Sequence, residues 1–347
     1  MTRSILRRSV WFALTIALAA ASGHAIQTVS AQVVSNDGPY RLTGNARLGY
    51  LASAHVYDPA LNRLYSSSPS GIFQTDLASM KILSRTTEVR GAGSLSLDAA
   101  RGELYVLALH DDAMRVIDVS TGKVVRSFAA PAWFNVFYEQ TKGELYYLRG
   151  DSHEVRIADR VTGKTITSMA LAGQPSFLLG DPARHRILVR LADKPQIQVI
   201  DTVDHSITAS WPARQDGLSA MALDDTGTRL FASAGRDVVM LDAATGKELA
   251  RCSAGAETTS MVFDASAGYL LALSGGNYIN VVKVSGDTLK PVQSLDTRTI
   301  VQELFLNPKT HAVLGISRRV DEDVFATTQM PSAIGATGGT ILTLTLK

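Results

Sequence analysis

Few residues in this chain have the type and spacing that chemistry requires. Cys252 is the one cysteine among 347 residues, which excludes an intrachain disulfide, a four-thiolate metal site and haem attachment through Cys-x-x-Cys-His. No nucleophile stands in a recognisable pattern with a general base, and no spacing of histidines and acids is typical of a metal set. The sequence therefore favours a binding protein over an enzyme, without catalytic residues, a metal or a cofactor.

Five polar residues form the candidate binding site: Glu303, Asn135, Ser94, Ser260 and His55. The first four lie four positions before a repeated anchor residue, and His55 lies three positions before one. The first four are expected on the face of a strand that looks toward a central channel. Their oxygens suit a polar ligand or a hard cation, but one carboxylate makes a poor metal site, so a lining that binds only water is the favoured interpretation. His55 falls in an otherwise apolar row. No acidic partner can be placed beside it, so we expect a hydrogen-bonded core histidine.

The pattern that places these residues is an apolar residue followed by an acidic or amide residue, the anchor, at intervals of 40 to 43. In one copy, Gly180 takes the apolar slot. The sixth and seventh residues after each anchor are apolar in all seven copies, as in Leu64-Tyr65. Such a period is typical of a repeat architecture. The anchors are Asp58, Asp98, Glu139, Asp181, Asp224, Asp264 and Asn307.

A second motif, Asp-x-x-Thr-Gly-Lys, follows the anchor in three copies, at residues 118–123, 159–164 and 242–247. Alternating apolar and polar residues flank it on both sides. The Thr-Gly pair predicts a tight turn, and the aspartate can accept backbone N–H bonds across it. Each copy therefore predicts four short antiparallel strands.

Seven four-stranded units predict an all-β fold, a seven-bladed β-propeller. One thin unit buries too little apolar surface, whereas seven packed around an axis share a core and leave short edges. The last copy supplies only three strands, at residues 302–306, 312–318 and 340–346. We predict that residues 40–48 add the fourth strand and close the ring, and that residues 321–339 form a long loop. Residues 32–347 are assigned to this single domain.

Residues 1–31 have the pattern of a cleaved signal peptide. Arg3, Arg7 and Arg8 precede a twelve-residue, largely apolar stretch, residues 10–21, which is too short to span a bilayer. Cleavage could follow Ala25 or, by preference, Ala31, and the sequence leaves Sec or twin-arginine export open. Without this segment 31 basic residues face 32 acidic ones, so we expect no nucleic-acid partner. The mature chain is predicted to be periplasmic or secreted, a monomer, and free of membrane spans.

In their repeated motifs, residues 40–347 resemble the YVTN-repeat propellers, in particular bacterial periplasmic proteins related to YncE. The resemblance rests on the hairpin at residues 116–123 and on Leu-Tyr in the second strand, at Leu64-Tyr65, Leu104-Tyr105 and Leu145-Tyr146. The eponymous tetrapeptide is absent. Most members have no assigned activity, so the resemblance implies a non-enzymatic binding or protein-interaction module, whose partner or small-molecule ligand it does not identify.

The alternative function is a propeller subunit or enzyme of the quinoprotein, amine dehydrogenase or lactonase type, with its site at the channel mouth. The quinoprotein alcohol dehydrogenases resemble eight-bladed rings with a tryptophan closing each repeat, whereas Val125, Ile166 and Leu249 follow the turns here. A lactonase would need several acidic and amide ligands converging on the channel, and only Glu303 and Asn135 are candidates.

Overall fold

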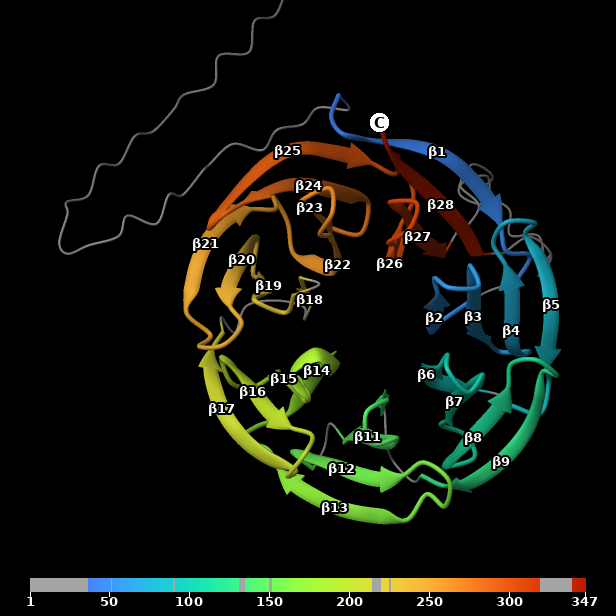
Figure 1. Cartoon of the computed structure of the whole chain (residues 1–347). Helices are drawn as coiled ribbons and strands as arrows, with labels where there is room; N and C mark the ends of the chain where they lie inside the picture. Colours follow the sequence, from blue (N-terminus) through green and yellow to red (C-terminus); the bar gives the residue numbers. More distant parts are fainter. Residues whose placement is uncertain are drawn as a thin grey trace, which may run out of the picture.

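The computed structural model describes residues 37–50, 52–89, 91–130, 135–149, 152–213, 220–224, 226–318 and 339–347. The predicted signal peptide and all but the last residue of the predicted loop 321–339 lie outside this part of the chain. The described residues form seven four-stranded antiparallel sheets arranged in a ring (Figure 1), which confirms the seven-bladed β-propeller. Among them, no helix has the length and apolar character needed to cross a membrane.

Blades 1 to 6 each take four consecutive strands, the first of them innermost. Blade 1 consists of β2 (His55–Asp58), β3 (Arg63–Ser68), β4 (Gly71–Asp76) and β5 (Lys81–Thr86). Blade 2 consists of β6 (Ala92–Asp98), β7 (Glu103–Ala108), β8 (Ala113–Asp118) and β9 (Lys123–Ala129). Blade 3 consists of β10 (Asn135–Glu139), β11 (Glu144–Arg149), β12 (Glu154–Asp159) and β13 (Thr165–Ala170).

The second half of the ring repeats this arrangement. Blade 4 consists of β14 (Pro175–Asp181), β15 (Arg186–Leu191), β16 (Gln196–Asp201) and β17 (Ser206–Pro212), with a 3-10 turn, η1 (Pro182–Arg184), after β14. Blade 5 consists of β18 (Met221–Leu223), β19 (Arg229–Ala234), β20 (Asp237–Asp242) and β21 (Glu248–Ser253). Blade 6 consists of β22 (Thr258–Asp264), β23 (Tyr269–Ser274), β24 (Tyr278–Ser285) and β25 (Thr288–Asp296).

Blade 7 joins the two ends of the chain, as predicted. It consists of β26 (Val301–Asn307), β27 (Ala312–Arg318), β28 (Gly339–Leu346) and, outermost, β1 (Tyr40–Arg47). β1 pairs with β28 from Tyr40 opposite Leu346 to Arg47 opposite Thr340. Tyr40 also ties the blade to its neighbour: its backbone N–H donates to Oε1 of Gln293 in β25 at 3.0 Å, and its carbonyl accepts from Nε2 at 2.7 Å.

Most anchors hold the turn that follows their innermost strand; Asp181 instead pairs through Oδ2 with Nε of Arg186 at 2.8 Å. Oδ1 of Asp58 accepts the backbone N–H groups of Ala60 at 2.9 Å and Leu61 at 3.2 Å. The Glu139 carboxylate and the Asn307 side-chain oxygen receive equivalent pairs of N–H bonds. Because a buried polar group must find partners, an acid or amide is the residue type that this position requires.

The Thr-Gly turns serve the contact between neighbouring blades as well as the hairpin. In the third motif, Oδ1 of Asp242 accepts the Thr245 N–H at 2.8 Å and its hydroxyl at 2.7 Å. The next residue, Gly246, has φ +71°, a conformation that favours glycine. A Cβ there would also overlap the indole of Trp211 in blade 4, so the turn needs glycine for conformation and for space.

The apolar core is divided into layers, most of which lie between two blades. One layer joins Met114 of β8 to Val136 of β10 and Tyr147 of β11, and another joins Ile197 of β16 to Val239 of β20. The seven sheets thus depend on one another for burial, as the repeat predicted.

Candidate functional site

The five predicted site residues lie on innermost strands of blades 1, 2, 3, 6 and 7. His55 and Asn135 are the first residues of β2 and β10, while Ser94, Ser260 and Glu303 are the third residues of β6, β22 and β26. In each of the latter three strands the pairing register shifts just before the site residue. Simple alternation did not predict these irregularities, which help to set the direction of the side chain that follows.

His55 and Glu303 come together across the junction of blades 1 and 7. Nδ1 of His55 lies 3.3 Å from Oε2 of Glu303. The imidazole is 2% exposed, whereas the Glu303 side chain is 41% exposed. Nε2 of His55 is buried and has no hydrogen-bond partner among the described residues. The expectation that no acid lies beside His55 was therefore wrong: ring closure brings in a partner 248 residues away in the sequence.

The two serines act as ties between neighbouring blades. Oγ of Ser94 donates to Oδ1 of Asn135 at 3.3 Å and accepts the Val136 N–H at 3.2 Å. Oγ of Ser260 accepts the Leu304 N–H at 3.0 Å. These hydroxyls satisfy backbone groups of the next innermost strand, so their first role is structural.

The predicted residues thus form separate contacts between blades. Glu303 pairs with His55 between blades 7 and 1, and Asn135 pairs with Ser94 between blades 2 and 3. Within the described ranges no group of three or more His, Cys, Asp and Glu side chains could hold a metal ion. Among the described residues of the predicted site, the most accessible charged group is therefore the half-exposed carboxylate of Glu303, which contacts the buried imidazole of His55.

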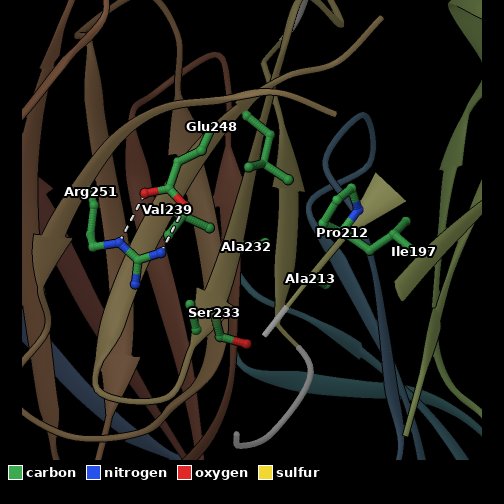
Figure 2. A pocket seen from close by; sticks show the side chains of 10 residues that line it. Ile197, Pro212, Ala213, Ala232, Ser233, Val239, Glu248 and Arg251 are labelled. Atoms are coloured by element: carbon green, nitrogen blue, oxygen red, sulfur yellow. Dashed lines mark hydrogen bonds and ion pairs between the residues drawn. The ribbon is translucent and has the colours of Figure 1, made fainter. Parts of the chain in front are cut away.

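Sequence reasoning missed two cavities because each is bounded by strands that are distant in the sequence. One, of about 260 Å³, is lined by the anchor ends of β6, β10 and β14, including Leu97, Phe137 and Gly180. The other, of about 170 Å³, lies between blades 4 and 5 (Figure 2). Beside the second, Arg190 is 2% exposed and donates through Nη1 to the Ser233 carbonyl at 2.8 Å.

Comparison with known proteins supports the fold. No family model matches the chain, and no curated protein matches it. Among solved structures it is similar to that of U3-55K, with a TM-score of 0.67 and 10% identity over 88% of this chain and 98% of that one. It is also similar to the β-propeller domain of Cps50 (Swd1) from Myceliophteria thermophila, with a TM-score of 0.68 and 14% identity over 89% and 100% of the two chains. At such identity the likeness establishes the β-propeller fold and no more.

Proposed function

We propose that this chain is an exported, YncE-like propeller that acts as a non-enzymatic protein-interaction module in the periplasm. The repeat motifs support the family, and the basic and apolar pattern of residues 1–31 supports export. A ring of seven rigid blades offers broad faces on which a partner can be held without a deep catalytic cleft.

The observation that carries the proposal is the exposure of Glu303 beside a buried partner. Its carboxylate is accessible on an innermost strand, and its Oε2 lies 3.3 Å from Nδ1 of the buried His55. The neighbouring polar groups of Ser94, Asn135 and Ser260 are engaged between blades. A lysine or arginine side chain of a protein partner would complement such a carboxylate through a charge-assisted hydrogen bond.

The proposal is tested with the mature chain, residues 32–347, immobilised as bait for a periplasmic extract. We expect one protein to be retained in stoichiometric amount by the wild type and lost on Glu303→Gln. Glu88→Gln is the matched control, because it removes the same charge from an exposed position between β5 and β6. Retention of the same partner by Glu303→Gln would overturn the channel assignment. Turnover of quinone-linked or lactone substrates by the pure chain would overturn the non-enzymatic role.

Export has its own test. Fractionation of cells producing the full chain should place the protein in the periplasmic fraction, with an N-terminus at Gln32 or, for the alternative cleavage, at Ile26. A cytoplasmic protein that begins at Met1 would refute this part of the proposal.

A further inference from the structure

The proposed interaction role does not involve the cavity between blades 4 and 5. It measures about 170 Å³ and is bounded by Ile197 and Pro212 from blade 4 and by Val239 and Leu241 from blade 5. Figure 2 shows Ile197 and Pro212 on one side of it, and Val239, Glu248 and Arg251 on the other.

β19 places two small residues, Ala232 and Ala234, in the lining of the cavity. Both join the core layer that also contains Ile197. On the matching strand of blade 4, β15, the residues equivalent to the two alanines are Val189 and Leu191. The two alanines therefore fill less volume than the branched pair of blade 4 does. Blade 6 has an equally small residue, Ala272, at the equivalent position, so the free space also depends on what the neighbouring blade places opposite.

The polar groups around the cavity are already engaged with one another. Nε and Nη2 of Arg251 donate to the two oxygens of Glu248 at 2.9 and 2.7 Å, and Nη1 donates to Asp237 at 3.1 Å. Oγ of Ser233 accepts the Ala220 N–H at 3.1 Å, and its carbonyl accepts from Arg190. A charged ligand would have to break one of these contacts, whereas an uncharged apolar one would not.

We propose that this cavity binds one small, uncharged, apolar molecule about the size of a six-membered carbon ring. An apolar cavity of about 150 Å³ takes up benzene in other proteins. This pocket has a similar volume and seven apolar residues among the ten that line it, and it opens to solvent at Pro212, which is exposed. The site belongs to the core between two blades and is independent of the channel carboxylate of the proposed interaction role.

Toluene and benzylammonium are the probes, because they share a ring and differ in charge. Thermal unfolding of the mature chain is followed at increasing probe concentration, since a ligand of the folded state raises the midpoint. We expect toluene to raise the midpoint in a saturable way and benzylammonium to bind at least ten-fold more weakly. Absence of a toluene shift, or equal affinity for benzylammonium, would overturn the proposal.

A matched pair of substitutions locates the effect. Ala232→Val adds two methyl groups where the cavity offers space, so we expect an unchanged or higher midpoint without ligand and at least a ten-fold loss of toluene affinity. Ala272→Val places the same change in the equivalent strand of blade 6, where the residue is fully buried in a packed layer. It should lower the midpoint and leave the toluene shift intact. A toluene shift that survives Ala232→Val would place the site elsewhere and refute the assignment.

Discussion

Single residues show how the repeat uses its polar side chains. Anchor side chains such as that of Asp58 accept backbone N–H groups of a turn. The serines of the predicted site, such as Ser260, accept backbone N–H groups of a neighbouring strand. Each of these groups loses much of its freedom to bind a ligand once the blades assemble. Glu303 differs, because the imidazole that it contacts, His55, is buried, whereas its own side chain stays 41% exposed.

Gly246 provides a residue-scale prediction about the Thr-Gly turns. Gly246→Ala should lower the free energy of unfolding by roughly 2–4 kcal/mol, because the new Cβ meets both a left-handed backbone and the Trp211 indole. Gly286→Ala is the control: φ there is +55° but nothing lies within 4 Å, so only backbone strain of about 1 kcal/mol is expected. Urea unfolding of both variants measures the difference. Equal losses would show that the indole contact contributes nothing.

Cys252 gives a second prediction at this scale. Burial raises the pKa of its thiol to about 12, and the residue is 1% exposed. Because the thiolate is the reactive form, labelling with a disulfide reagent at pH 8 should be slower in the folded chain than in urea by on the order of 10³-fold. Absorbance of the released thiol follows the reaction. Rapid stoichiometric labelling of a chain that retains its circular dichroism would contradict the buried environment.

At the scale of elements, β1 is the strand that decides whether the ring closes. Gln293 is 1% exposed and binds both backbone groups of Tyr40, while the Tyr40 hydroxyl donates to Oδ2 of Asp264 at 3.1 Å. Blade 6 therefore binds the beginning of β1 through the amide of Gln293 and the carboxylate of Asp264. These contacts join residues more than 220 positions apart in the sequence.

Gln293→Ala should weaken this closure by roughly 2–4 kcal/mol, since it leaves two buried backbone groups of Tyr40 unpaired. Hydrogen exchange should accelerate first in β1 and β28, before the rest of the ring. Thr43 lies in the same strand, and its exposed hydroxyl donates to the Thr343 carbonyl of β28. Thr43→Ala removes this bond and should change the free energy of unfolding by less than about 0.5 kcal/mol. Uniform exchange across all seven blades in Gln293→Ala would argue against a local closure.

The strands were predictable because the residues that specify them lie close together in each repeat. The anchors, the Leu-Tyr pairs and the Thr-Gly turns predicted four strands per blade, and the surplus strand at residues 40–48 had only one vacant place. The pairing of His55 with Glu303 was not predictable, because it depends on how two distant strands meet. The cavity was missed for the same reason: the size of Ala232 matters only opposite Ile197 of another blade.

At the scale of the whole molecule, carboxylates with lowered pKa values are distributed around the ring. Hydrogen bonds from Ser120 and Thr121 lower the pKa of Asp118, equivalent bonds act on Asp159 and Asp242, and Arg126 lowers that of Glu103. For Asp264, burial acts to raise the pKa, and bonds from Ala267, Ser266, His311 and Tyr40 outweigh it. In each case the folded chain binds its proton less readily than the unfolded chain.

These shifts predict the direction of the acid response. Because the folded-state pKa values lie below the unfolded ones, the stabilisation is complete above the ordinary carboxyl range near pH 4 and is lost as the pH falls through the folded-state values. The urea midpoint should therefore drop steeply between pH 5 and about pH 3. Asp264→Asn should flatten this dependence, because it removes the carboxylate whose pKa is lowered by its hydrogen bonds. An unchanged midpoint at pH 3 would refute the linkage.

The joining of β1 to β28 also sets an order of events for a newly made chain. Residues 40–47 are made before the other strands of the ring, yet their pairing strand follows only after the six blades that lie between them in the sequence. Until then β1 waits as an unpaired strand, and six blades can assemble while the seventh stays open at its edge. A partly synthesised chain would thus remain accessible to chaperones and proteases until the eight-residue strand β28 is made and pairs with β1.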